Sequence, residues 1–121
     1  MAQPPTVKKG SHGDAVKGLQ NALNVRSHEH LEVDGTFSAK TEGAVKHFQA
    51  ERHVEADGIV GPKTWTALEV HLVQSGDTLS GIAEELLGDA SRWPEILDLN
   101  EALISDPDEI FPGQVFSLPS A

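Results

Sequence analysis

One pattern occurs twice within the first 69 residues, and this repeat constrains the fold more than any other feature of the sequence. Residues 34–45 read DGTFSAKTEGAV and residues 57–68 read DGIVGPKTWTAL. A second pairing joins AVKGLQ at 15–20 to AVKHFQ at 44–49. Self-similarity of this kind indicates a unit built from repeated supersecondary pieces. We therefore expect residues 7–69 to form one unit, in which short helices are separated by Asp-Gly turns.

The pieces of the repeat have the spacing of amphipathic helices. Apolar residues at i, i+3, i+4 and i+7 lie on one helix face. This spacing predicts helices over 14–23 and 38–51. Gly61-Pro62 begins a third, because the missing N–H of proline is no loss at the first helical position. The residues expected on the buried faces are Val16, Leu19, Gln20, Leu23, Thr41, Ala44, Val45, Phe48, Trp65 and Leu68.

The spacing changes after Val70 and predicts the order strand, helix, helix, strand. Residues 71–74 and 115–118 are rich in strand-forming residues. Between them, apolar spacing predicts one helix over 79–87, which ends at Gly88, and a second that begins at Trp93. The expected fold class is therefore α+β: a tail over 1–6, a three-helix bundle over 7–69 and a βααβ domain over 70–121.

The charge is divided unevenly between these two units. The chain has 9 Lys and Arg against 19 Asp and Glu, a formal net charge of −10. Residues 1–69 are nearly balanced, whereas residues 70–121 contain Arg92 as their one Lys or Arg beside ten acids. This balance argues against nucleic acid, whose phosphates attract clustered cations, and against charge-driven binding to anionic membranes. The chain has no cysteine, which excludes disulfides, cysteine zinc sites and thiol catalysis.

No part of the sequence has the length and apolar character of a membrane-spanning segment. The first nine residues contain no apolar run, so we expect no secretory signal there. Three expectations are compatible with this: synthesis in the cytoplasm with another release route to the cell wall or the outside of the cell, earlier removal of a signal, or a chain that is a piece of a longer one.

The first unit resembles the peptidoglycan-binding domain family, the three-helix module attached to many cell-wall hydrolases. The match covers about residues 7–69, with Ser38 where the family often has glycine; serine is a good helix N-cap. The resemblance supplies four candidate ligand-binding residues in this unit, although helical spacing by itself favours a core position for Trp65. The residues that carry the match include Gly10, Gly13, Asp34, Gly35, Phe37, Ala44, Gln49, Asp57, Gly58, Gly61 and Trp65, and the four candidates among them are Asp34, Phe37, Asp57 and Trp65.

The second unit resembles a LysM domain over about residues 71–120. The family packs two helices on one face of a two-stranded antiparallel sheet and recognises glycans that contain N-acetylglucosamine. It does so in a shallow groove between two loops, which correspond here to 76–79 and 103–110. The match rests on Val73, Gly76-Asp77-Thr78-Leu79, Ile82-Ala83, Gly88, Trp93, Asn100, Pro107, Pro112-Gly113-Gln114 and Leu118-Pro119, and the candidate ligand-binding residues are Gly76, Asp77, Thr78, Leu79, Ile104, Ser105, Asp106 and Pro107.

The chemistry of such a groove agrees with these residue types. Exposed polar groups of a turn hydrogen-bond the acetamido group of the sugar, and a small apolar wall takes its methyl group. Helical spacing favours core positions for Leu79, Ile104 and Trp93. For Trp93 the alternative is an exposed indole that stacks on a sugar face. For Asp77 and Thr78, helix capping and ligand contact are equally compatible with the sequence.

The sequence shows no catalytic or metal-binding pattern. His28 and His30 flank Glu29, but no third ligand is near in the sequence, and the H-E-x-x-H and G-x-S-x-G patterns are absent. Paired carboxylates of a glycosidase need a deep cleft, which modules of this size do not form. We therefore expect no cofactor, no metal and no catalysis.

Three functions follow, in order of preference. The first is non-catalytic binding of peptidoglycan or another N-acetylglucosamine-containing glycan by two short-linked modules, with avidity from their linkage. The second is a structural adaptor of a phage-tail or contractile-injection particle, in which the acidic LysM-like unit contacts a protein. The third is the wall-targeting part of a cell-wall hydrolase. The short connection near residues 68–71 predicts a fixed arrangement of the modules.

Overall fold

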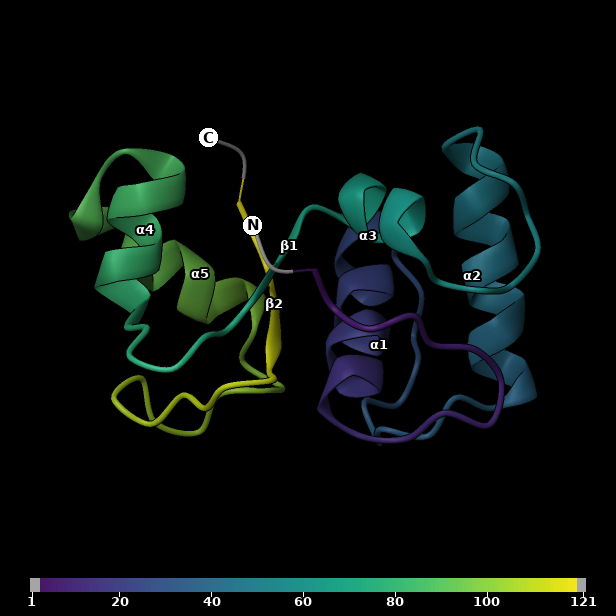
Figure 1. Cartoon of the computed structure of the whole chain (residues 1–121), viewed down its shortest axis with the longest axis horizontal. Coiled ribbons are helices and arrows are strands. Elements are labelled where there is room, and N and C mark those ends of the chain that lie inside the picture. The colour runs from purple at the N-terminus through teal and green to yellow at the C-terminus, as the bar shows by residue number, and fades with distance from the viewer. Residues whose placement is uncertain (1–2, 120–121) are drawn as a thin grey trace.

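The computed structural model describes residues 3–119 and confirms the mixed α+β class. Three helices come first, and a second group of helices follows between the two strands in chain order. The strands pair as an antiparallel sheet that lies beside this second group (Figure 1). None of the helices within residues 3–119 is long and apolar enough to cross a membrane. The elements are α1 (Asp14–Ser27), α2 (Ala39–Glu51), α3 (Pro62–Leu68), β1 (Val70–Leu72), α4 (Leu79–Leu87), η1 (Ala90–Arg92), α5 (Trp93–Leu99) and β2 (Val115–Ser117).

The helix boundaries follow from local chemistry at most of the predicted positions. The Ser38 hydroxyl accepts a hydrogen bond from the Thr41 N–H at the start of α2, and Pro62 opens α3. Gly88 ends α4 in the left-handed conformation, with φ 77°, as predicted. The first helix continues four residues beyond the predicted end at Leu23, so its last turn carries Arg26 toward the C-terminal strand.

The three-helix unit encloses its own core. Leu19, Phe48 and Trp65 are almost completely buried there. The Trp65 indole N–H donates to the Pro5 carbonyl at 3.0 Å, and Val7 forms a β-bridge with Val60. The segment before α1 is therefore part of the unit, since it covers α3 and satisfies the polar group of the buried indole.

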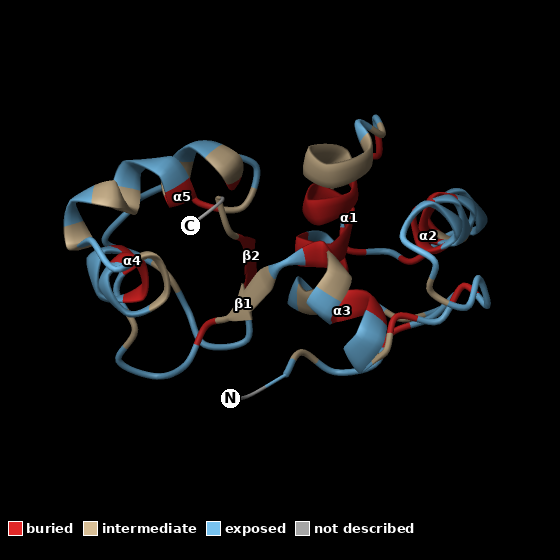
Figure 2. Cartoon of the chain, turned by 90° about the horizontal axis from the view of Figure 1, so that it is seen from above, coloured by how far each residue is buried: buried red, intermediate tan, exposed pale blue. Residues whose placement is uncertain are grey.

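The two-stranded sheet contributes one face to each of two cores. Leu72 pairs with Val115 and His71 with Phe116 in the antiparallel register. Because successive side chains of a strand point to opposite faces, Leu72 and Val115 lie together on one face and Phe116 lies on the other. Val115 packs in the core of the three-helix unit, whereas Phe116 packs with α4 and α5. The sheet lies between α1 and the second pair of helices (Figure 2).

The close approach of α1 to β2 depends on a glycine. A Cβ atom placed on Gly18 would lie 2.5 Å from both the Val115 Cβ and the Val115 carbonyl oxygen. Only glycine allows the strand to pass this near to the helix. One turn further along α1, the Asn21 amide donates to the Leu99 carbonyl and to Asn100 Oδ1, both at 3.0 Å. The two units are thus joined by apolar packing and by buried hydrogen bonds.

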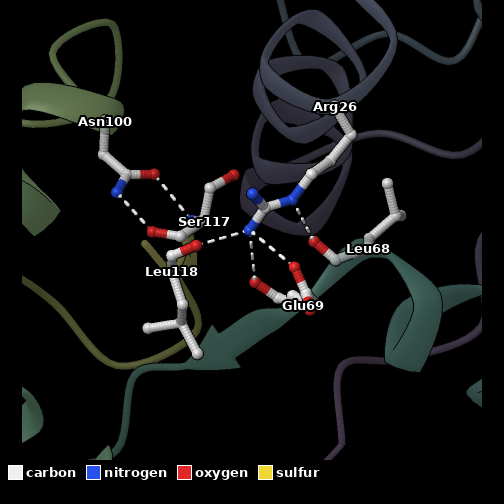
Figure 3. A network of polar contacts seen from close by, with 6 residues as sticks. All are labelled: Arg26, Leu68, Glu69, Asn100, Ser117 and Leu118. Carbon is white, nitrogen blue, oxygen red and sulfur yellow. Dashed lines mark hydrogen bonds and ion pairs between the residues drawn. The ribbon is translucent and has the colours of Figure 1, made fainter. Parts of the chain in front are cut away.

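A network of polar contacts also joins the two units near the C-terminal end of α1. The Arg26 guanidinium donates to the carbonyl oxygens of Leu68, Glu69 and Leu118 (Figure 3). Beside it, Asn100 Oδ1 accepts a hydrogen bond from the Ser117 N–H at 2.8 Å, and Asn100 Nδ2 donates to the Ser117 carbonyl at 2.9 Å. These bonds join α1, the short connection between the units and the C-terminal strand, so the units have a fixed arrangement in the structure.

Candidate functional site

A groove opens between the loop that follows β1 and the loop that precedes β2. It has a volume of about 460 Å³. Its lining combines carboxylate and hydroxyl side chains with an indole, a proline and two aliphatic side chains. The lining residues are Asp77, Thr78, Leu79, Ser80, Trp93, Pro107, Asp108 and Ile110.

Asp77 is held at the mouth of this groove by one of its two carboxylate oxygens. Oδ2 accepts the Gln74 N–H at 2.8 Å and lies 2.9 Å from His71 Nε2. Burial acts to raise the pKa of Asp77, but these two hydrogen bonds and the nearby imidazole outweigh it and keep the pKa below its ordinary value. Within residues 3–119, Oδ1 accepts no hydrogen bond. That oxygen remains available to a ligand.

The residues next to Asp77 both support the fold and line the groove. Thr78 caps α4 through its hydroxyl, which accepts the Gly81 N–H at 3.0 Å. Leu79 packs in the second core and still lines the groove. Trp93 lines the groove as well and is only half-buried. Helical spacing favoured a core position for Trp93, whereas its place in the groove lining depends on where the loop of Pro107 lies.

The structure brings together four of the eight predicted residues of the second unit, namely Asp77, Thr78, Leu79 and Pro107. Ile104 is 7% exposed and belongs to the core. Gly76, Ser105 and Asp106 are exposed but do not line the groove. Asp106 instead shapes the loop, since its Oδ1 accepts the Asp108 N–H at 2.9 Å. Ser80, Trp93, Asp108 and Ile110 are lining residues that the sequence prediction did not include.

The four candidates of the first unit do not converge on one site. Phe37 and Trp65 are each 1% exposed and fill the core. Asp34 and Asp57 are exposed and line two separate pockets, of about 220 and 480 Å³. Asp34 Oδ1 accepts the Thr36 N–H and a Gln20 amide N–H, which hold the Asp34 pKa below its ordinary value. The structure therefore leaves the two aspartates, and not the two aromatic residues, in reach of a ligand.

The histidines near residue 29 lie outside all of these pockets. Glu29 instead lies 3.2 Å from the His47 ring on α2. Across the part of the chain that the structure describes, no three His, Asp or Glu side chains are grouped as metal ligands.

Comparison with known proteins identifies both units. The family model described as "Putative peptidoglycan binding domain" matches residues 12–68, and the LysM domain model matches residues 71–119. The chain is 41% identical over 54 residues, 45% of its length, to the potassium binding protein Kbp of Escherichia coli O6:H1. It is 36% identical over 76 residues, 60% of its length, to the zinc D-Ala-D-Ala carboxypeptidase of Streptomyces albus G. It spans 36% and 28% of these two relatives.

A solved structure supports the first assignment. The SleB N-terminal domain superposes with a TM-score of 0.52 at 30% identity, over 55% of this chain and 90% of that one. Both matched domains are cell-wall-binding modules. The carboxypeptidase relative, which is named as an enzyme, is a much longer chain than the region that matches. Residues 12–68 therefore belong to the peptidoglycan binding domain family, and residues 71–119 form a LysM domain.

Proposed function

We propose that this protein is a non-catalytic binder of bacterial cell wall and that the groove of its LysM domain holds an N-acetylated amino sugar of the wall glycan. The observation that supports this most is the lining of the groove, which combines hydroxyl and carboxylate acceptors with apolar groups. N-acetylglucosamine presents the matching groups, an amide N–H and C=O beside a methyl.

The polar and the apolar residues of the groove have distinct parts in this proposal. Asp77 Oδ1 accepts the acetamido N–H or a sugar hydroxyl, because Oδ2 is committed to His71 and Gln74. The edge of the Trp93 indole and the ring of Pro107 contact the apolar face of the sugar. A shallow groove buries little ligand surface, so the affinity of this single site is low, and the second module adds to it through linkage.

The test is sedimentation of the whole chain with purified peptidoglycan, together with titration of a soluble N-acetylglucosamine oligomer. The whole chain is used because β2 of the LysM domain packs against α1, and separation would expose Val115. We expect Trp93 fluorescence to change on titration. The double variant Asp108→Asn with Ser80→Ala should weaken binding, because it removes a carboxylate and a hydroxyl from the groove lining. Asp98→Asn with Ser75→Ala changes the same residue types outside the groove and serves as the matched control. Equal binding by both double variants would refute the assigned groove.

A protein partner is the second candidate, and a separate observation favours it. Phe111 is 58% exposed next to the groove residue Ile110, in a domain with ten acids and one arginine. Acidic surface is repelled by a polyanionic wall and attracted to a basic protein surface. If sacculi do not sediment the chain at low or high salt, wall binding fails and the adaptor function is favoured. Binding that strengthens with salt indicates glycan contact opposed by charge.

A third use of the same modules is targeting of a hydrolase. The carboxypeptidase relative is more than three times as long as the region matched, since the chain covers 28% of it. In that case the modules deliver a separate catalytic domain to the wall, and the binding experiments above have the same expected results.

A further inference from the structure

The two pockets of the first unit are built from corresponding positions of its internal repeat. Aligning residues 31–45 with 54–68, and residues 15–20 with 44–49, places every residue that lines the first pocket opposite a residue that lines the second. The first pocket is lined by Gln20, Leu31, Glu32, Asp34, Ser38, Lys40 and Thr41, and their counterparts are Gln49, Val54, Glu55, Asp57, Gly61, Lys63 and Thr64.

The glutamine of each pocket makes corresponding hydrogen bonds, and Gln20 accepts one more, from the Asp34 N–H at 3.1 Å. The buried Gln20 amide donates to Asp34 Oδ1, the Thr36 carbonyl and Thr41 Oγ1, and its oxygen accepts the Gly35 N–H. The buried glutamine of the second pocket donates to an aspartate, a carbonyl and a threonine in the same way, and it accepts a glycine N–H. Gln49 donates to Asp57 Oδ1, the Ile59 carbonyl and Thr64 Oγ1, and its side-chain oxygen accepts the Gly58 N–H.

Six of the fifteen positions aligned over 31–45 carry the same residue in both copies: Glu, Asp, Gly, Lys, Thr and Ala. Four of the six have a role in folding. The aspartate and the threonine bind the glutamine, the glycine adopts φ of 78° or 77°, and the alanine lies in or against the core. The glutamate and the lysine have no such role. Among residues 3–119, neither Glu32 and Glu55 nor Lys40 and Lys63 form a side-chain hydrogen bond or ion pair.

We propose that the peptidoglycan-binding unit contains two equivalent ligand sites, one in each copy of the repeat, and that each takes a peptide segment bearing both an ammonium and a carboxylate. The retained lysine binds the carboxylate, and the retained glutamate with the free Oδ2 of the aspartate binds the ammonium. This inference rests on the proposed wall-binding function. The stem peptides of peptidoglycan carry both charges and recur along the glycan, so the two sites suit two stems of one polymer.

The pockets differ in ways that set their relative strength. The second is larger, and Ile59, which is 42% exposed, and Pro62 add apolar surface to it. The corresponding residues of the first copy are Thr36 and Ala39. We therefore expect the second pocket to bind more tightly than the first, because it removes more apolar ligand surface from water.

The test is an amide NMR titration of the whole chain with a synthetic stem tetrapeptide that has a free side-chain amine and a free C-terminal carboxylate. The Gly35 and Gly58 amides report on the two pockets separately, since each donates to the glutamine of its own pocket. We expect both amides to shift and to saturate, Gly58 at the lower peptide concentration. A tetrapeptide with its amine acetylated and its carboxylate amidated should shift neither.

The variants assign each shift to its pocket. Lys40→Gln should abolish the shift of Gly35 and leave that of Gly58, and Lys63→Gln should do the reverse. Lys9→Gln removes an exposed lysine outside both pockets and should change neither. Shifts in only one pocket, equal shifts with the neutral peptide or no shifts at all would overturn the inference. If sacculi still sediment the chain in that case, the proposed function stands and only the paired peptide sites are lost.

Discussion

Replacing Gly18 by alanine tests whether α1 and β2 are in direct contact. In an ordinary helix interior this change is stabilising, because alanine has the higher helix propensity by about 0.8–1 kcal/mol. Here the added methyl would lie 2.5 Å from the Val115 Cβ and 2.5 Å from its carbonyl oxygen. The obstructing atoms include backbone, so a rotamer change cannot relieve the clash, and β2 has to move away from α1.

The magnitude follows from two opposing effects. Overpacking of a well-packed core costs about 1–3 kcal/mol, and a clash with backbone atoms falls in the upper part of that range, about 2–3 kcal/mol. The propensity gain offsets about 1 kcal/mol of it. The expected outcome for Gly18→Ala is a net loss of about 1–2 kcal/mol in the free energy of unfolding. Gly43 is the matched control, because it is an exposed helical glycine of α2 whose added Cβ meets nothing within 4 Å. Gly43→Ala should therefore stabilise the protein by about 1 kcal/mol.

Urea unfolding followed by circular dichroism measures both variants on one scale. The two should differ by about 2–3 kcal/mol, which corresponds to roughly 10 °C in the melting temperature of a chain of this size. A loosened interface should also separate the unfolding of the three-helix unit from that of the LysM domain in Gly18→Ala. If Gly18→Ala is as stabilising as Gly43→Ala, the close packing of β2 on α1 is refuted.

Three further variants test the polar groups. Asn100→Ala leaves the buried Ser117 N–H and two carbonyls without their partner, so we expect a loss of about 3 kcal/mol by calorimetry. Ser117→Ala removes the one buried hydroxyl that lacks a partner within residues 3–119, and stability should stay the same or rise by up to about 1 kcal/mol; a clear loss would contradict this. For Asp77, the lowered pKa means that the carboxylate contributes stability above its unfolded value of 3.8 and loses it as pH falls through the lower folded value. The stability gap between wild type and Asp77→Asn should therefore close below about pH 4, and a gap independent of pH would contradict the assignment.

Much of the local structure could be predicted because its causes are local. Ser38 and Gly88 mark helix ends through capping and left-handed geometry, which depend on a few adjacent residues. The position of Asp77 and Thr78 at the groove was expected from the resemblance to LysM domains, whereas their local sequence was equally compatible with helix capping alone. Trp93 was harder to predict as a lining residue, because it meets the groove only through the path of the 103–110 loop, which is distant from it in sequence. Asp108 lies within that expected loop but was not among the candidate residues.

The sequence by itself determined the two units, their helices and strands, and the repeat of Gln, Asp-Gly and Lys-Thr that organises the first unit. Only the tertiary structure decided that the LysM sheet lies between two cores, that Asn21 meets Asn100 and that the repeat forms two matching pockets. The physical reason is the range of the interactions. Hydrophobic spacing and turn chemistry act over a few residues, whereas the fit of Gly18 against Val115 depends on atoms that the folded chain alone brings within contact.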